Sequence, residues 1–234
     1  NPPRYVELHA RSAFSFLRGA SEPEELAAAA ADLGMPAMAL LDRDGVYGAP
    51  RFHMAAKKLG LRAHIGAEIT AADGAVHALL AESRTGYQNL CRLITRMKLR
   101  ARKYEGAAAP HEFAEFAQGL ICLVRDPERL AWAVETFGPR NVYAELQRHL
   151  DRRQEARNQA LVERARRLRI PLLATNGVAY ARPAGREILD VLTCVREKVR
   201  LDSAGRLLQK NGECYLKPAA EMERLFADLP EAIA

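Results

Sequence analysis

The chain has 234 residues, of which 49% are hydrophobic and 27% are charged, and these values suit a globular protein that can bury its own core. No apolar run approaches the roughly 20 residues that a membrane-spanning helix needs, so we expect no membrane partner and a cytoplasmic location. The four cysteines lack the paired close spacing of a structural zinc site, and we expect no disulfide framework.

The net charge of +6 is unevenly distributed along the chain. Between Arg92 and Lys103 there are six cations and no acid, and between Arg148 and Arg169 eight arginines stand against three acids. Such clusters attract nucleic acid, although solvated helix faces carry them as well. The sequence leaves both interpretations open.

In chain order, alternation predicts a first strand at Tyr5–Leu8, and the next segment predicts a helix over residues 22–34. Ser21 and Glu24 have the spacing of a capping box, and Gly34 is placed to end this helix. The remaining elements alternate in the same way. We expect strands at 35–42, 61–70, 75–83, 119–124, 142–147 and 170–177, and helices at 48–60, 86–103, 127–138, 151–169 and 186–197.

Strands that alternate with helices at least six times imply parallel pairing through right-handed crossovers. No glycine-rich phosphate loop opens a helix, which disfavours a dinucleotide-binding sheet. We therefore predict an α/β barrel, in which functional groups follow the carboxyl ends of the strands. The polar residues at these positions are His9, Asp42, Glu68, Glu145 to His149, and Asn176.

Six segments in order resemble the polymerase and histidinol phosphatase (PHP) domain. They are similar to the version at the N-terminus of bacterial C-family DNA polymerase III alpha subunits, closest to the error-prone (translesion) type. The resemblance implies a distorted (β/α)7 barrel of the TIM-like type, with residues 1–234 forming a single PHP domain, an N-terminal fragment of a much longer subunit. The segments are ELHARSAFSFLRGAS, LGMPAMALLDRDGVYGAPRF, IGAEIT, GYQNLCRLITRMKL, ELQRHLDRRQEARNQAL and ATNGVAY…ILDVLTCVR.

In active members of this family, nine side chains hold up to three divalent metals that activate water to attack a phosphate ester. Carried over motif by motif, three ligands are retained: His9, Glu68 and His149. Asp42 is also retained, next to a lost histidine position. The six replaced positions are Arg11, Arg18, Arg43, Lys98, Gly177 and Ala179.

The chemistry of the replacements predicts a degenerate pocket without metal. Arginine has no lone pair for a metal and stays protonated, so Arg11, Arg18 and Arg43 would repel a divalent ion. A guanidinium can instead satisfy a buried carboxylate such as Glu68 or Asp42, and we hypothesise that salt bridges replace the metal cluster. The alternative is a residual zinc site of His9, Glu68 and His149.

The resemblance thus implies a non-catalytic scaffold, without a cofactor of its own, that supports DNA synthesis across lesions by a parent nucleotidyltransferase. Magnesium is expected only in the polymerase domain outside this chain. The implied partners are the other polymerase domains and, through the parent, DNA, a sliding clamp and accessory mutagenesis proteins. The alternatives are an active divalent-metal phosphoesterase or 3′–5′ proofreading exonuclease, and a stand-alone phosphate- or nucleic-acid-binding module. Candidate DNA-facing residues are Arg96, Arg100, Arg102 and Lys103.

Overall fold

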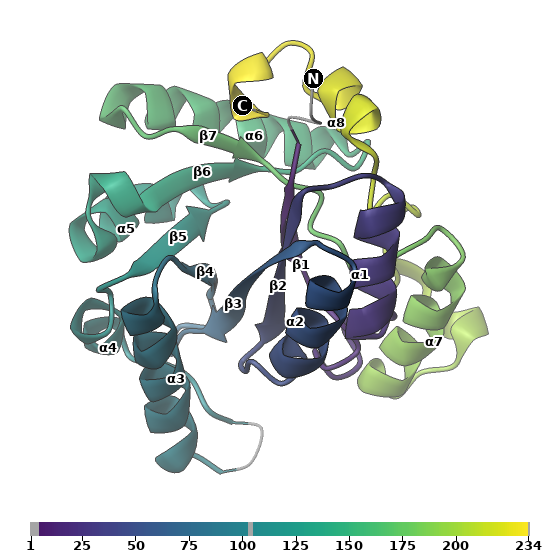
Figure 1. Cartoon of the computed structure of the whole chain (residues 1–234), viewed down its shortest axis with the longest axis horizontal. Helices are drawn as coiled ribbons and strands as arrows, with labels where there is room; N and C mark the ends of the chain where they lie inside the picture. Colours follow the sequence, from purple (N-terminus) through teal and green to yellow (C-terminus); the bar gives the residue numbers. More distant parts are fainter. Residues whose placement is uncertain (1–4, 103–104, 234) are drawn as a thin grey trace.

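The computed structural model describes residues 5–102 and 105–233, so the predicted DNA-facing residue Lys103 lies outside the described residues. Seven strands form one curled sheet in sequence order, and each matches a predicted strand (Figure 1). They are β1 (Glu7–Ala10), β2 (Ala37–Arg43), β3 (Arg62–Thr70), β4 (Val76–Ala81), β5 (Leu120–Val124), β6 (Val142–Leu146) and β7 (Leu172–Ala174).

The two ends of the sheet meet, which confirms the predicted distorted barrel. Ala10 of β1 forms a parallel bridge with Val178, just beyond β7. The Val178 N–H donates to the carbonyl of His9 at 2.9 Å, and the Arg11 N–H donates back to the carbonyl of Val178 at 2.9 Å. These bonds bring the end of β1 beside the segment that follows β7.

The expectation of parallel pairing throughout was wrong for one strand. β4 pairs antiparallel with both β3 and β5, whereas the other neighbouring strands pair in parallel. Only the turn of residues 71–75 separates β3 from β4, and its Gly74 has a φ of +81°. A parallel crossover needs a dozen or more residues, and this short connection can therefore only form a hairpin.

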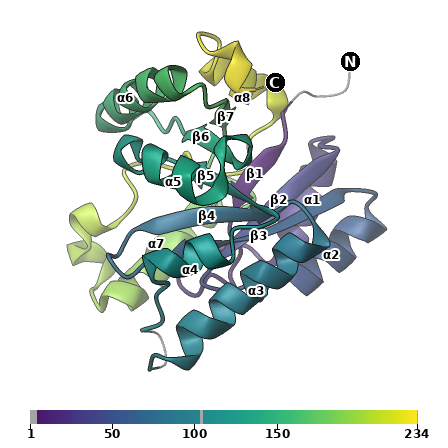
Figure 2. The same cartoon turned by 90° about the vertical axis from the view of Figure 1, so that its left-hand side faces the viewer.

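Helices cover the outside of the sheet, and α3 and α4 lie together below it (Figure 2). The predicted helices are present, and α4 and α8 are additional. None of the helices in the described ranges is long and apolar enough to cross a membrane. The helices are α1 (Pro23–Asp32), α2 (Ala49–Lys58), α3 (Arg84–Leu99), α4 (Pro110–Glu115), α5 (Leu130–Phe137), α6 (Arg152–Leu168), α7 (Gly185–Glu197) and α8 (Ala219–Leu225), with short 3-10 turns η1 (Pro127–Arg129), η2 (Pro139–Asn141), η3 (Leu201–Ser203), η4 (Gly205–Leu207) and η5 (Pro230–Ala232).

The start of α1 differs from the predicted capping box by one residue. The Glu22 N–H donates to Glu25 Oε2 at 3.0 Å, so the reciprocal pair begins at Glu22 rather than Ser21. Ser21 Oγ instead accepts a hydrogen bond from the Ala181 N–H at 2.9 Å. This tertiary contact occupies Ser21, and Pro23 suits the first turn because its fixed φ matches the helix.

Alternating residues of the strands divide the core into two layers. On β2, Met38 and Leu40 belong to the large cluster packed against the helices, whereas Ala39 and Leu41 belong to a small interior cluster. That interior cluster also contains Ala78, Leu80 and Leu123. A small apolar plug thus fills the barrel and supports the polar residues at its carboxyl end.

Candidate functional site

The polar layer follows directly from the period of the strands. Side chains two residues apart lie on the same face of a strand, so each polar residue continues the face of an interior residue before it. These interior and polar pairs are Leu41 with Arg43, Gly66 with Glu68, Leu123 with Arg125, Tyr143 with Glu145, and Leu173 with Thr175. The sequence therefore places two acids and two arginines above one apolar plug.

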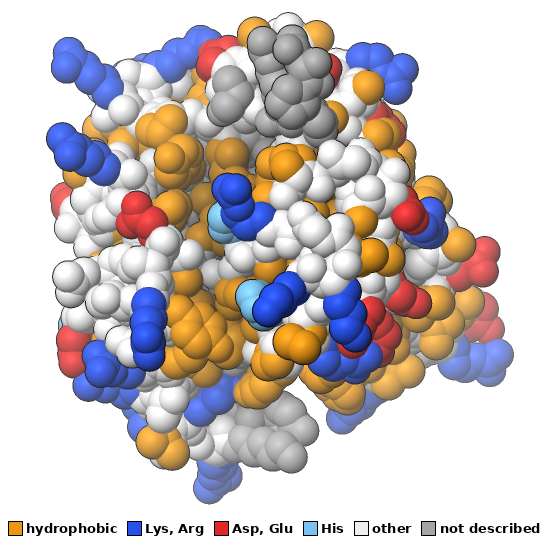
Figure 3. Space-filling model, viewed as in Figure 1, with side chains coloured by type: hydrophobic (Ala, Val, Ile, Leu, Met, Phe, Trp, Pro, Cys, Tyr) orange, Lys and Arg blue, Asp and Glu red, His pale blue; other side chains and the backbone are white. Residues whose placement is uncertain are grey.

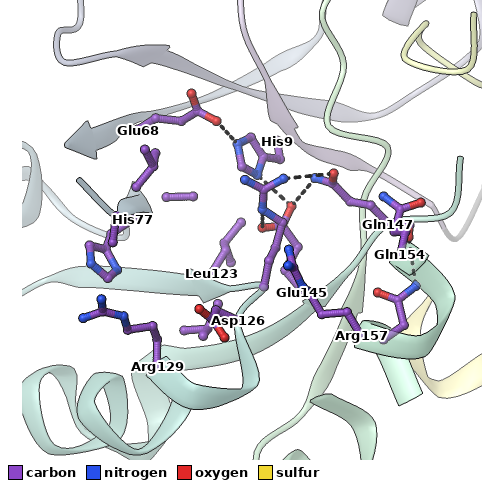
Figure 4. Close-up of a pocket in the computed structure, with 16 residues that line it drawn as sticks. His9, Glu68, His77, Leu123, Asp126, Arg129, Glu145, Gln147, Gln154 and Arg157 are labelled. Carbon is purple, nitrogen blue, oxygen red and sulfur yellow. Dashed lines mark hydrogen bonds and ion pairs between the residues drawn. The ribbon is translucent and has the colours of Figure 1, made fainter. Parts of the chain in front are cut away.

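His9 connects two buried carboxylates across the barrel (Figure 4). Its Nδ1 lies 2.7 Å from Glu145 Oε1 and its Nε2 lies 2.8 Å from Glu68 Oε1, with all three side chains buried. Burial lowers the pKa of His9, but Glu145 and Glu68 outweigh burial and raise the pKa to about 9. His9 is therefore an imidazolium that donates from both ring nitrogens and has no lone pair left for a metal.

Glu68 receives the ion pairs that the sequence predicted for it. Arg43 Nε lies 2.9 Å from Glu68 Oε2, and Arg11 Nη2 lies 3.2 Å from Glu68 Oε1. Burial raises the pKa of Glu68, but Arg11, His9 and Arg43 outweigh burial and hold the pKa well below its usual value. Glu68 is a fully ionised carboxylate bound by three cationic groups.

Glu145 is the second ionised carboxylate of the site. Its Oε1 accepts hydrogen bonds from His9, from Thr175 Oγ1 and from Gln147 Nε2, the last at 2.9 Å. Burial raises its pKa, but His9, Arg125 and Thr175 together outweigh burial and the pKa falls to about 2. Its Oε2 has no hydrogen-bond partner among the described residues, with Arg125 Nε 3.9 Å away.

Glu7 is a third buried acid, and sequence reasoning missed it. Its carboxyl group accepts hydrogen bonds from Tyr5 Oη at 2.6 Å, from the His9 N–H at 2.8 Å and from the Asn176 N–H at 2.9 Å. These donors lower the pKa, but burial outweighs them and raises it to about 7. The spacing of Glu7 two residues before His9, on the same strand face, was the signal that could have identified it.

Asp42 does not join the arginines, which corrects the expectation that a guanidinium satisfies it. It accepts hydrogen bonds from the Ser12 N–H and the Ser15 Oγ, both at 2.8 Å, and from the Gly48 N–H at 3.1 Å. The reason is strand parity, because Asp42 continues the helix-facing side of Met38 and Leu40. Asp42 therefore holds the loop after β1 in place, away from the barrel interior.

His149 does not complete a metal site with His9 and Glu68. Its Nε2 lies 2.8 Å from the carbonyl oxygen of Asn176 and its Nδ1 lies 3.1 Å from Gln154 Nε2. Burial lowers its pKa, so the ring is neutral, with Nε2–H as donor and Nδ1 as acceptor. Both nitrogens are occupied by local hydrogen bonds.

The space at Gly177 is filled by another side chain. A Cβ atom at Gly177 would lie 2.5 Å from Gln147 Nε2, and the residue has a φ of +56°. The side chain of Gln147 fills this space, and its Nε2 donates hydrogen bonds to Glu145 Oε1 and to Thr175 Oγ1. Ala179 is buried, with its backbone bonded to Ala20 and Cys214, and faces no ligand set.

The last two replaced positions lie at the surface. Arg18 is exposed, and burial and the nearby charges of Arg43, Arg196 and Arg11 lower its pKa. Lys98, on α3, donates from Nζ to Tyr47 Oη at 2.5 Å. The structure thus brings Arg18 near the predicted pocket and pairs Lys98 with the loop before α2.

A cavity of about 300 Å³ lies beside the His9 bridge (Figure 4). His9, Glu68 and Glu145 line one side of it, and Arg129 and Arg157 line another. The cavity is therefore rich in cations as well as acids. In the space-filling view, lysine and arginine side chains lie near the centre of the face shown and around its rim (Figure 3).

The basic segment of α3 is partly neutralised by α4. Arg96 forms an ion pair with Glu115, and Arg100 binds both carboxylate oxygens of the buried Glu112. Arg102 is exposed. Of the predicted DNA-facing residues, two are thus engaged in binding the neighbouring helix.

These residues do not fit the metal cluster that the family resemblance implies. Within residues 5–102 and 105–233, no group of three or more His, Cys, Asp or Glu side chains is arranged to hold a metal ion. Both nitrogens of His9 face carboxylates, and Arg11 and Arg43 occupy the carboxylate of Glu68. The described residues of the pocket therefore do not form a ligand set that could hold a metal-activated water.

Comparison with known proteins identifies relatives over most of the chain. Residues 7–128 match the family model described as PHP domain. The chain is 42% identical over 248 residues to an error-prone DNA polymerase of Anaeromyxobacter sp. (strain K), covering 99% of this chain and 22% of that protein. It is 37% identical over 240 residues to error-prone DNA polymerase 1 of Rhizobium meliloti (strain 1021), covering 98% of this chain and 22% of that protein. The chain thus spans about a fifth of the length of these relatives.

A solved structure supports the same fold. A protein of Bifidobacterium adolescentis described as a metal-dependent phosphoesterase superimposes with a TM-score of 0.53 at 15% identity, covering 76% of this chain and 88% of that one. At this identity the likeness establishes the fold alone.

Proposed function

The chain belongs to the PHP domain family, and from this premise we propose that it is a non-catalytic PHP scaffold of an error-prone DNA polymerase III alpha subunit. The observation that carries the proposal is the position of His9. Its two ring nitrogens face Glu145 and Glu68 at 2.7 and 2.8 Å, where the family resemblance implies a metal ligand. The imidazolium stabilises the carboxylates that a metal would otherwise neutralise.

The charges around Glu68 support a site without metal. A divalent ion on Glu68 would lie close to Arg11 and Arg43, and like charges at such short distances repel strongly in a partly buried site. It would also have to break the contact between His9 Nε2 and Glu68 Oε1 at 2.8 Å, while His9 Nδ1 stays bound to Glu145. A buried carboxylate without a cation is strongly destabilising, which explains why the arginines are useful to the fold.

The activity of the longer parent protein is part of the same proposal. We propose that it is a DNA-directed DNA polymerase that extends DNA across lesions, and that this chain supports its other domains. Its magnesium site and its contacts with a sliding clamp and accessory mutagenesis proteins are proposed to lie outside this chain. A cytoplasmic location accords with such a polymerase.

Metal analysis together with a nuclease assay tests the proposal. The chain is purified without chelator, dialysed against zinc or manganese, and measured for bound metal and for 3′–5′ cleavage of a labelled single strand. We expect less than stoichiometric metal and no turnover. Two or three tightly bound metal ions with cleavage would support the alternative of an active phosphoesterase or proofreading exonuclease.

Matched variants separate the two outcomes. If the chain is an active enzyme, His9→Ala and Glu68→Ala each abolish cleavage, whereas the exposed His53→Ala does not. If the chain is a scaffold, none of the three variants changes the background rate, and His9→Ala changes only stability. A contaminating nuclease gives cleavage that is unaffected by every variant.

A further inference from the structure

The loop between β1 and α1 is tightly folded on itself. The Ser15 N–H donates to the Ser12 carbonyl at 2.9 Å, and the Arg18 N–H donates to the Ser15 carbonyl at 2.7 Å. A Cβ at Gly19 would lie 2.2 Å from the Ser12 oxygen, so only glycine allows this close approach. Together with the hydrogen bonds to Asp42, these contacts make the loop a fixed support rather than a flexible connection.

The loop holds an aromatic ring in solvent. Phe16 is 72% exposed, the largest exposed fraction of any aromatic side chain in the described part of the chain. Leu17, next to it, has a φ of +61°, a conformation that is unfavourable for a leucine, and its carbonyl oxygen accepts a hydrogen bond from Arg196 Nη1 at 2.8 Å. Strained residues of this kind cluster at functional sites. A strained backbone that is fixed by an arginine thus presents Phe16 outward.

Four arginines lie in or beside this loop: Arg11 and Arg18 within it, Arg43 at the end of β2 and Arg196 on α7. Arg11 and Arg43 bind Glu68, Arg196 binds Leu17 and Glu197, and Arg18 forms no ion pair with a described residue. The acids that form ion pairs with these four arginines are Glu68 and Glu197. The buried Nε of Arg11 also has no hydrogen-bond partner within the described ranges. The cluster therefore has an excess of positive charge and unused donors.

The mutual repulsion of these arginines is consistent with that excess. Burial and the charges of Arg43, Arg196 and Arg11 lower the pKa of Arg18. Like charges held close together are destabilising unless an anion joins them. Guanidinium groups bind phosphate oxygens bidentately, and an exposed ring offers a stacking surface to any base.

We propose that Phe16 and the cluster of Arg11, Arg18, Arg43 and Arg196 form a binding site for single-stranded nucleic acid. The arginines bind backbone phosphates and Phe16 stacks on one base. Because neither interaction reads the edge of a base, the site has no sequence preference. The site goes beyond the proposed scaffold role, because it gives the domain a ligand of its own and uses guanidinium groups instead of metal.

The test measures the fluorescence anisotropy of a fluorescein-labelled ten-nucleotide deoxythymidine strand titrated with the chain in EDTA. We expect Phe16→Ala to weaken binding about tenfold, since one stacked base contributes roughly 1–3 kcal/mol and 1.4 kcal/mol is a factor of ten. We expect Arg18→Ala to lower the slope of log K against log salt by roughly 0.7, the value for one phosphate contact on a single strand.

Control variants remove one arginine and one exposed apolar side chain between α2 and the start of β3. Arg62→Ala removes an exposed arginine that has no ion pair with a described residue, and Leu59→Ala removes an apolar side chain that is 48% exposed. Both are expected to bind like the original chain. Phe16→Trp is expected to retain binding because it keeps a stacking ring, and circular dichroism confirms that each variant is folded.

Three results would overturn the inference. Equal loss of affinity in Arg62→Ala and Arg18→Ala would mean that only net charge attracts the strand. Equal binding of poly-glutamate would indicate an acidic protein ligand instead of nucleic acid. Binding that appears only when manganese replaces EDTA would indicate a metal site, and that result would also contradict the proposed function, whereas the first two would leave the proposed function intact.

Discussion

His9 Nδ1 lies 2.7 Å from Glu145 Oε1, although 136 residues separate the two in sequence. With Glu68 on the other ring nitrogen, the imidazolium connects β1 to β3 and to β6. His9 binds both carboxylates above an apolar layer of the barrel interior. Without His9, the buried Glu145 would keep only Arg125, 3.9 Å away, as a nearby cation.

His9→Ala is therefore expected to destabilise the fold by about 3–5 kcal/mol, the effect of removing one partner from a buried ion pair. Urea denaturation followed by circular dichroism measures the change. His53→Ala, on the exposed face of α2, is the matched control and should change the free energy of unfolding by less than about 0.5 kcal/mol. Equal effects of the two substitutions would show that the bridge contributes nothing.

The same bridge predicts how stability depends on pH. The pKa of His9 is raised to about 9 in the folded state, so its contribution is fully present below its unfolded pKa near 6.5 and is lost as the pH rises through about 9. The pKa of Glu145 is lowered to about 2, so its contribution is present above about pH 4.5 and is lost as the pH falls through about 2. Urea midpoints measured from pH 2 to 10 should fall at both ends, and in His9→Ala the alkaline fall between pH 6.5 and 9 should disappear.

Glu7→Gln tests a buried acid whose pKa is raised, whereas that of Glu145 is lowered. The folded pKa of Glu7 is raised to about 7, so folding favours its protonated form and ionisation destabilises the fold as the pH rises from about 4.5 to 7. A shift of this size corresponds to about 3 kcal/mol across that window. We expect the free energy of unfolding to vary less with pH in Glu7→Gln than in the original chain between pH 5 and 8. An unchanged pH profile would mean that Glu7 is ionised throughout.

The sequence predicted the strands and most helices well because hydrophobic period and helix-ending glycines are local signals. It failed at β4, where the short turn of residues 71–75, rather than the pattern of the strand, decides the direction of pairing. It failed at Ser21, because the contact with Ala181 depends on how the chain returns after β7. The first error was avoidable, because the few residues between the predicted strands at 61–70 and 75–83 are too short for a parallel crossover. The second concerns geometry that only the assembled barrel provides.

In the candidate site, too, some residues could be predicted from local sequence signals and others could not. The positions of Glu68 and Arg43 follow from strand parity, which is local, and the predicted ion pairs of Glu68 with Arg43 and Arg11 are present. Asp42 has the other parity, and counting along β2 from the apolar residues would have placed it on the helix side. Gln147 contacts Arg125 and Arg196 contacts Leu17, partners 22 and 179 residues away in sequence, so no local motif identifies these two contacts.

The basic segment of α3 gives a prediction about stability. Because Arg100 binds both oxygens of Glu112 and the Ala107 carbonyl, Arg100→Ala should lower the melting temperature, by roughly 2–4 °C. Arg102→Ala removes an exposed arginine close by and should leave the melting temperature unchanged. Differential scanning fluorimetry measures both. If Arg100→Ala melts like Arg102→Ala, Arg100 is free to face DNA, and the ion pair does not explain its presence.

Gly177→Asp tests whether the pocket has been refilled around a lost ligand. The added Cβ would meet Gln147 Nε2 at 2.5 Å, so we expect destabilisation by about 1–3 kcal/mol, the usual effect of overpacking. Gly205→Asp is the matched control, because Gly205 has a similar φ of +47° but nothing within 4 Å of the added Cβ, and its smaller effect isolates the strain of the backbone. Adding Gln147→Ala should recover part of the loss at Gly177→Asp, which a double-mutant cycle in urea measures. Full additivity of the two substitutions would show that Gln147 does not occupy the space of the missing aspartate.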